Sequence, residues 1–184
     1  MERYQQVKLY KQVKANDRKA LEILFEQYYS SLCNFAMLIV KKEELAEEVV
    51  SDIFFILWRD RHHLEINHSV KAYLFRSVRN HALKAVGEKS VIFEEIEDES
   101  ARMVIDRTPE SDYLYQELSN TYKQAYNTLP GKCKQIFKLH KIDGLKYQEV
   151  SDVLNISIKT VENHMLKALK AIRRAVVNYQ VEET

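Results

Sequence analysis

Residues 147–174 read YQEVSDVLNISIKTVENHMLKALKAIRR and contain two amphipathic helices joined by a very short connector. In the second helix, apolar residues recur at helical spacing along one face and polar residues recur along another. The apolar face comprises Val161, Met165, Ala168, Leu169, Ile172 and Val176. The polar face comprises Lys159, Asn163, Lys167, Lys170 and Arg174. This pattern predicts a helix that packs on one side and is free to bind on the other.

The connector predicts a helix-turn-helix. Asn155 is the non-glycine residue that best tolerates a left-handed backbone, and Ser157 is a preferred N-cap for the helix that follows. Gly144 is placed to end the preceding helix, although Lys146 stands where a capping Ser or Thr is expected before Tyr147. The alternative is an ordinary helical hairpin whose lysine-rich face is only solvated. The turn residues and the helix length together favour the helix-turn-helix.

The composition predicts an all-α fold. The 184 residues include only three Gly and two Pro, and nearly every segment repeats its apolar residues at three- and four-residue spacing. The best strand candidate is Ser90–Glu95.

Cys33 and Cys133 match no metal or redox spacing, so we expect buried, reduced thiols in a cytoplasmic protein. The longest apolar run, Phe35–Val40, is far shorter than the ~18 residues of a membrane span, and we expect neither membrane insertion nor a secretory signal.

Charge is unevenly distributed along the chain. Residues 1–86 contain 14 Lys or Arg and 11 Asp or Glu, residues 87–112 contain 3 and 9, and residues 113–184 contain 11 and 7. The sequence therefore predicts two small helical domains, 1–86 and 113–184, joined by a flexible acidic linker at 87–112. Two cationic blocks are suited to a protein that contacts a polyanion at two separate places.

Four helices are expected in each domain. The first four are expected at about Gln5–Lys14, Asp17–Val40 with a break near Ser30, Glu43–Arg61 and Ser69–Val86. The other four are expected at Tyr113–Thr128, Gly131–Ile142, Tyr147–Leu154 and Ile158–Val177. The apolar stripe after the Asp17 N-cap comprises Leu21, Leu24, Phe25, Tyr28 and Leu32. The expected core around it comprises Phe35, Leu38, Val49, Ile53, Phe54, Leu57 and Trp58.

The second domain carries the predicted DNA-reading helix. At ~18 to 20 residues this helix is ~30 Å long, so its first turns can enter a major groove while its far end reaches phosphate. Asn and Lys are typical readers of purine edges, Glu accepts from cytosine, and Thr contacts a thymine methyl. Thr160 has an alternative role, in which its hydroxyl bonds back into the helix. The predicted DNA-binding residues are Tyr147, Ser157, Lys159, Thr160, Glu162, Asn163, Lys167, Lys170 and Arg174.

The first domain carries a second basic helix, SVKAYLFRSVRNHALKAV at 69–86, preceded by the polar loop HHLEINH at 62–68. The helix is able to follow a phosphate backbone, and the loop is able to hold an unstacked base; a solvated basic face is the alternative. The helix before the loop is acidic through Glu47, Glu48 and Asp52 and suits a protein partner, with a plain solvated face as the alternative. The histidines 62, 63 and 68 lack metal-site spacing, so neither a metal site, a cofactor nor an enzyme is expected.

Three segments resemble a known family in the same order along the chain. They are AEEVVSDIFFILW, YLFRSVRN, and the run from Leu129 that includes KTVENHM. The chain resembles the alternative sigma factors of bacterial RNA polymerase, specifically the extracytoplasmic-function (ECF) group of the sigma-70 family, and most resembles its Bacteroidetes-type branch. The resemblance covers about residues 20 to 175.

The resemblance implies a fold, a function and a set of partners. The fold is a region 2-like helical bundle and a region 4-like helix-turn-helix domain, which recognise the minus-ten and minus-thirty-five promoter elements. The implied partners are core RNA polymerase, through the clamp helices of its largest subunit and the flap of its second-largest subunit, promoter DNA, and an anti-sigma protein. The implied polymerase-binding residues are Glu48, Asp52, Phe54 and Trp58. The implied minus-ten residues are His63, Leu64, Asn67, Arg76, Arg79, Asn80 and Lys84.

Two alternatives remain open at this point. One is a stand-alone helix-turn-helix regulator, which would bind its operator tightly without polymerase and as a dimer. The other is a helical metal-dependent enzyme built around the histidines.

Overall fold

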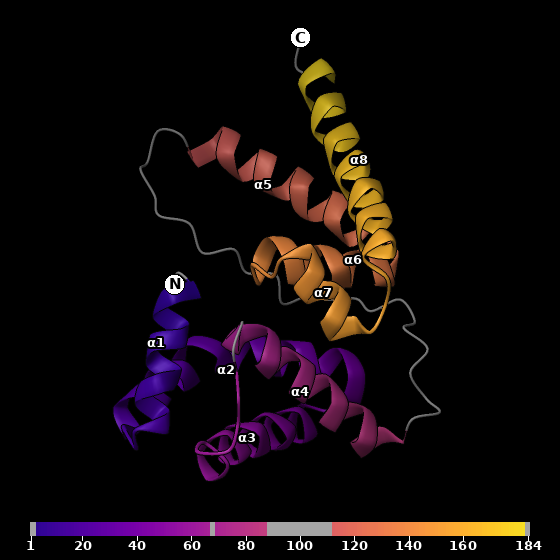
Figure 1. Cartoon of the computed structure of the whole chain (residues 1–184). Helices are drawn as coiled ribbons and strands as arrows, with labels where there is room; N and C mark the ends of the chain where they lie inside the picture. The colour runs from indigo at the N-terminus through magenta and orange to yellow at the C-terminus, as the bar shows by residue number, and fades with distance from the viewer. Residues whose placement is uncertain (1–2, 67–68, 88–111, 183–184) are drawn as a thin grey trace. The chain divides into compact units, whose positions relative to one another are not determined.

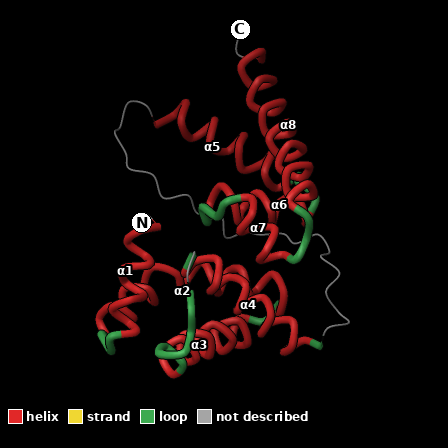
Figure 2. Tube along the Cα trace, viewed as in Figure 1, coloured by secondary structure: helices red, strands yellow, loops and turns green. Residues whose placement is uncertain are grey.

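The computed structural model describes residues 3–66, 69–87 and 112–182 (Figure 1). Within these ranges the chain consists of helices and short connectors, with no strand (Figure 2). The all-α prediction is therefore confirmed. The elements are α1 (Arg3–Lys14), α2 (Arg18–Val40), α3 (Glu43–Arg59), α4 (Val70–Val86), α5 (Asp112–Asn127), α6 (Gly131–Phe137), the π-helix η2 (Lys138–Ile142), α7 (Tyr147–Leu154) and α8 (Ile158–Glu182).

The chain divides into two compact units, Met1–Ile92 with Gln148–Ile156 and Phe93–Tyr147 with Ser157–Thr184. The domain bounds 1–86 and 113–184 stay predictions. The predicted linker and the strand candidate Ser90–Glu95 lie outside the described residues, apart from the linker's two ends at Gly87 and Asp112.

Helix α2 is the central helix of the first unit and packs against α1, α3 and α4. Its N-terminus is capped by Asp17, whose Oδ1 accepts from the backbone N–H of Lys19 at 2.9 Å and of Ala20 at 3.3 Å. It ends at Lys41, which adopts the left-handed conformation with φ 55°. The buried residues of α2 are Ala20, Leu24, Tyr28, Leu32, Phe35, Ala36, Ile39 and Val40.

The expected break near Ser30 is wrong, because α2 runs unbroken through this position. The Ser31 hydroxyl donates to the Tyr28 carbonyl at 3.0 Å, so the serine is accommodated inside the helix by bonding back to the preceding turn.

α2 is also long and apolar enough to cross a membrane by length and composition. Its apolar side forms the interior of a helical bundle, which accounts for this composition without a membrane.

In the second unit, α8 packs against α5 and α6. The Cys133 thiol of α6 donates to the His164 carbonyl of α8 at 3.0 Å. The expected helix Gly131–Ile142 ends differently from the prediction, because its last turn is the π-helix η2, in which the Asp143 N–H donates to the Lys138 carbonyl at 2.9 Å. Gly144, with φ 70°, then turns the chain as expected, and the Leu145 N–H reaches the Leu139 carbonyl at 2.9 Å.

Other sequence-based expectations differ from the structure in detail. α3 ends at Arg59 rather than Arg61, and α8 continues to Glu182. Leu169 is exposed rather than packed, and Phe25 remains 37% exposed although its ring packs against Tyr29 and Phe54. Four further residues are half-buried: Leu21, Leu38, Trp58 and Val176. Both cysteines are free thiols; Cys133 is buried, and Cys33 is only half-buried. Helical spacing identifies which side of a helix is apolar, but residues at the edge of that side remain partly in solvent.

Candidate nucleic-acid interface

The N-terminus of α8 is fixed by its own first residues. The Ser157 Oγ accepts from the Thr160 N–H at 3.0 Å, which satisfies one of the unpaired donors of the first turn. The hydroxyl oxygens of Ser157 and Thr160 lie 2.8 Å apart and share a hydrogen bond. Ser157 is therefore the predicted N-cap, and the Thr160 hydroxyl is engaged with that cap.

The outward face of α8 is cationic and exposed. Its packed face is buried at Val161, Met165, Ala168 and Ile172, as the spacing predicted. The Lys159 Nζ forms an exposed i,i+3 ion pair with the Glu162 Oε2 at 3.4 Å, so part of its charge is balanced at the start of the helix. The remaining predicted residues of this helix are exposed and lie along one side of it: Asn163, Lys167, Lys170 and Arg174.

The turn before α8 is held by Ser151 of α7. The Ser151 Oγ donates to the Ile156 carbonyl at 2.7 Å, and the Ile156 N–H donates to the Ser151 carbonyl at 3.1 Å. Asn155 adopts the left-handed conformation with φ 53°, as the sequence predicted. The C-terminal end of α7 is therefore closed by two reciprocal hydrogen bonds and one left-handed residue.

Tyr147, at the start of α7, is half-buried rather than fully presented to solvent. Its ring meets the His140 ring edge-on, with the centroids 4.5 Å apart. His140 is itself held by a 2.8 Å hydrogen bond between its Nδ1 and the Leu145 carbonyl. Tyr147 thus has a packing role in the structure in addition to the DNA-binding role predicted from the sequence.

Helix α4 of the first unit carries a second polar stripe. Arg76, Asn80 and Lys84 are exposed and follow one another at four-residue spacing, which places them on one side of the helix. Arg79 lies beside this stripe and is half-buried; its Nε is buried without a hydrogen-bond partner among the described residues. Burial lowers the pKa of the Arg79 guanidinium. The stripe is therefore formed by three exposed side chains, with Arg79 at its partly covered edge.

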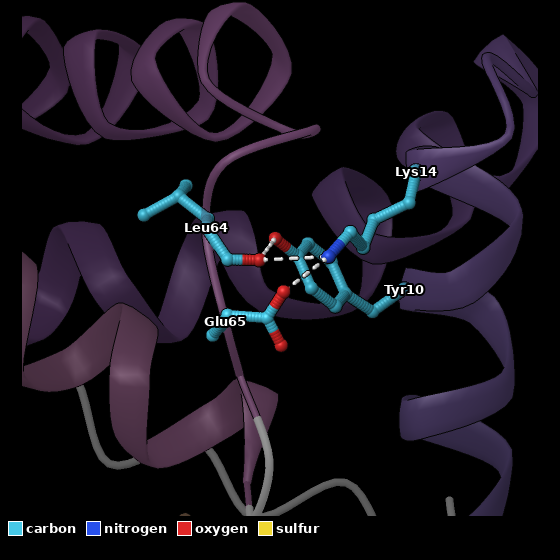
Figure 3. Close-up of polar contacts among 4 residues, drawn as sticks. All are labelled: Tyr10, Lys14, Leu64 and Glu65. Carbon is cyan, nitrogen blue, oxygen red and sulfur yellow. Dashed lines mark hydrogen bonds and ion pairs between the residues drawn. The ribbon is translucent and has the colours of Figure 1, made fainter.

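The loop between α3 and α4 is anchored to α1. The Leu64 carbonyl accepts from the Tyr10 hydroxyl at 3.0 Å and from the Lys14 Nζ at 3.3 Å, and the Lys14 Nζ also pairs with the Glu65 Oε1 at 3.0 Å (Figure 3). Ile66 is buried, whereas His63 is exposed and the Leu64 side chain is half-buried. Asn67 lies outside the described residues. The loop thus turns part of its backbone towards the bundle.

The exposed face of α3 differs from the predicted one in its aromatic residue. Glu48 and Asp52 are exposed, but Phe54 is 5% exposed and packs edge-on against Phe25 with the ring centroids 5.0 Å apart. Trp58 is half-buried. Phe55, by contrast, is 61% exposed and shares the side of Glu48 and Asp52 by helical spacing. Phe55 is the residue that sequence reasoning missed, although the spacing alone could have indicated it.

The described residues contain no group of three or more His, Cys, Asp and Glu side chains that could hold a metal ion.

Comparison with known families and proteins gives consistent matches along this chain. Residues 24–90 match the family model described as Sigma-70 region 2, and residues 119–172 match that described as Sigma-70, region 4. Together the two matches cover well over half of the chain, in the order found in the sequence.

Curated relatives are similar over nearly their full length. The chain is 25% identical to the ECF RNA polymerase sigma factor SigW of Bacillus subtilis, covering 89% of this chain and 92% of the relative. It is 22% identical to the ECF RNA polymerase sigma-E factor of Haemophilus influenzae, covering 91% of this chain and 93% of the relative.

Solved structures share the fold. The structure of CnrH in complex with the cytosolic domain of CnrY matches with a TM-score of 0.55 and 19% identity, covering 92% of this chain and 96% of the other. The sigma factor RpoE in complex with the anti-sigma factor NepR, from Bartonella quintana, matches with a TM-score of 0.51 and 19% identity, covering 86% of this chain and 97% of the other.

Proposed function

Because the chain belongs to the sigma-70 family and carries its regions 2 and 4, we propose that it is an ECF-type factor that brings core RNA polymerase to a particular set of promoters. The observation that carries this proposal is the occurrence of both region matches, in order, in one short chain. A factor of this family is a non-catalytic initiation factor. Its residues therefore act by binding and positioning, and no covalent step is assigned to them.

In the proposed function α8 reads the minus-thirty-five element. Its exposed side carries an amide and three cations, which are the groups that contact base edges and phosphates in a major groove. We assign a base contact to Asn163, near the start of the helix, and phosphate contacts to Lys170 and Arg174, two and three turns further on. A helix of 25 residues is about 37 Å long, which is sufficient to enter the groove and reach the backbone beyond it.

The first unit is proposed to act at the minus-ten element. The exposed stripe of α4 follows the phosphate backbone, and the loop that includes His63 and Leu64 captures a base that has left the stack, with Asn67 as a further contact. Extruding a base costs a few kcal/mol, which a fitted site can offset. Capture of a base by this loop therefore gives a physical basis for promoter melting.

Helix α3 is proposed to bind core polymerase through the clamp helices of the largest subunit. The support is an exposed, acidic side that carries Glu48 and Asp52 and also an exposed aromatic ring at Phe55. An acidic face repels DNA, and an aromatic ring surrounded by charges is typical of a protein interface. Phe54 and Trp58 support this face from within the bundle. The second domain is proposed to meet the flap of the second-largest subunit.

An anti-sigma protein is the further proposed partner. Two of the matching solved structures are complexes, one of CnrH with the cytosolic domain of CnrY and one of RpoE with the anti-sigma factor NepR. By analogy, an inhibitor would cover the polymerase-binding or DNA-binding side of this chain until a signal releases it.

We also propose that the protein acts in the cytoplasm together with core polymerase. Its membership of the Bacteroidetes-type branch is a further proposal, which rests on the sequence KTVENHM.

Run-off transcription tests the proposed function. Core polymerase alone should give no specific start sites on a genomic library, and adding the full-length protein should give a defined set of them. A gel-shift titration with and without core polymerase separates this role from that of a stand-alone regulator. Tight specific binding by the isolated protein, with no start-site selection by the polymerase, would contradict the proposal.

A further inference from the structure

Helix α1 holds one carbonyl of the α3–α4 loop from two directions. The Tyr10 hydroxyl and the Lys14 Nζ both donate to the Leu64 carbonyl, at 3.0 and 3.3 Å, and Figure 3 shows the two side chains converging on that oxygen. The Lys14 Nζ also reaches the Glu65 Oε1 at 3.0 Å. Two consecutive loop residues are thus tied to one helix that lies more than 50 residues away in sequence. The region 2 match begins at residue 24, after α1 has ended.

The start of the same loop is tied to the turn that follows α1. The Arg61 Nε donates to the Asn16 Oδ1 at 2.7 Å, and the Arg61 guanidinium lies over the Trp58 ring, 4.1 Å from its centroid. Asn16 holds its side chain there from a left-handed backbone with φ 69°. Contacts from α1 and its turn therefore bracket residues 61–65 on both sides.

Burial leaves the Tyr10 hydroxyl with few possible hydrogen-bond partners. Tyr10 is only 3% exposed, so its hydroxyl has little access to water and depends on the Leu64 carbonyl for a partner. Burial, followed by the nearby Tyr73 and Glu65, raises the pKa of Tyr10 to about 12. The hydroxyl is protonated at neutral pH, as in any tyrosine, and therefore donates to the Leu64 carbonyl. His62 and His63, in contrast, are exposed. The loop backbone at Leu64 is fixed, while the histidine side chains beside it face solvent.

We infer that Tyr10 and Lys14 are positioning residues for promoter opening, and that they hold the Leu64–Glu65 backbone in the form that accepts an unstacked base. The inference rests on the proposed function of the loop. Neither side chain needs to touch DNA, because both act through the carbonyl that they share. Pre-organising a binding loop lowers the cost of capture, so loss of these contacts should slow capture rather than abolish promoter binding.

The first variant is Tyr10→Phe, which removes one oxygen and keeps the ring. Its matched control is Tyr28→Phe, because the Tyr28 hydroxyl is equally buried in the same unit but has no hydrogen-bond partner among the described residues. Full-length proteins are assayed with core polymerase on a duplex promoter and on the same promoter with a premelted minus-ten region. Tyr10→Phe should reduce open-complex formation on the duplex about fivefold, the typical effect of one hydrogen bond. It should have a much smaller effect on the premelted template, and Tyr28→Phe should match the wild type on both.

The second variant is Lys14→Met, with the exposed Lys11→Met on the same helix as its control. Lys14→Met should show the same dependence on the template, Lys14→Arg should restore activity because it keeps the donors, and Lys11→Met should be neutral. A panel of base substitutions across the minus-ten element gives a second readout, in which discrimination between bases should weaken only in Tyr10→Phe and Lys14→Met.

Two results would overturn the positioning role while leaving the proposed function intact. The first is equal activity of Tyr10→Phe and Tyr28→Phe on every template. The second is a uniform loss on duplex and premelted templates, which indicates less folded protein rather than a misplaced loop. Failure of the wild-type protein to direct initiation at all would instead overturn the proposed function.

Discussion

Ser157 and Thr160 are joined by three hydrogen bonds at the N-terminus of α8. The Thr160 N–H donates to the Ser157 Oγ at 3.0 Å and to the Ser157 carbonyl at 2.9 Å, and the two hydroxyl oxygens share a hydrogen bond at 2.8 Å. Together they close the first turn of the helix that is proposed to read DNA. The cap thus stabilises the helix and also places two hydroxyl groups at the end proposed to approach the DNA.

Two substitutions at Ser157 should separate stability from DNA binding. Ser157→Ala removes the capping oxygen and should lower the free energy of unfolding by about 1 kcal/mol. Ser157→Asp keeps a capping oxygen and should preserve stability, but it adds a negative charge close to phosphate and should weaken promoter binding. Urea unfolding followed by circular dichroism, together with a promoter titration, measures both effects. A similar loss of stability in the two variants would contradict the capping role.

The adjacent residues Phe54 and Phe55 should respond in opposite ways to truncation. Phe54→Ala empties a buried site beside Phe25 and should cost about 3–5 kcal/mol of stability. Phe55→Ala removes a ring that is 61% exposed and should change stability by less than about 0.5 kcal/mol, while weakening binding to core polymerase. Thermal unfolding and a pull-down with core polymerase give the two readouts. Normal polymerase binding by Phe55→Ala would remove this ring from the proposed interface.

Asn163 and Lys167 should affect DNA recognition differently. Lys167→Ala should weaken binding by a similar factor on all DNA sequences and reduce the slope of log affinity against log salt by about 1, as expected for one lost phosphate contact. Asn163→Ala should leave the salt slope unchanged and alter the preference at one base pair. Binding to a set of single-base promoter variants at several salt concentrations tests both. The reverse pattern would exchange the two proposed roles.

The stability of the second unit should depend on the protonation of His164. Burial, with smaller contributions from Lys167 and Lys132, lowers the pKa of His164 from its ordinary value of 6.5. The unfolded chain therefore binds the proton more readily than the folded chain. The contribution of His164 to the free energy of unfolding is fully present above pH 6.5 and is lost as the pH falls from 6.5 towards the lower pKa of the folded state. Urea midpoints measured from about pH 7.5 down to about pH 5 should fall more steeply for the wild type than for His164→Gln. Parallel curves would exclude this contribution.

The sequence predicts the helix-turn-helix well because its signals are local. Val161, Met165, Ala168 and Ile172 are buried as their spacing indicates, since each lies on the same side of one regular helix. The N-cap and the left-handed turn depend equally on single residues, and both are observed. Leu169 lies at the edge of the apolar side, and its 44% exposure shows where spacing ceases to determine burial.

Other features depend on information that one stretch of sequence does not contain. The contacts of α1 with the Leu64 carbonyl involve a backbone atom, which every residue has, and they therefore leave no pattern in the composition of the loop. The π turn at Lys138–Ile142 likewise follows from the path that the chain takes into Gly144.

Helix α2 has a consequence for synthesis on the ribosome. It emerges before α3 and α4, the two helices that cover much of its apolar side, and by length and composition it is similar to a membrane-spanning segment. Translation at about 5–20 residues per second needs about 2 to 9 s to extend the chain from the end of α2 to the end of α4. During this interval the nascent chain exposes apolar surface of the kind that promotes aggregation until it is covered. Docking of α3 and α4 removes this surface from solvent.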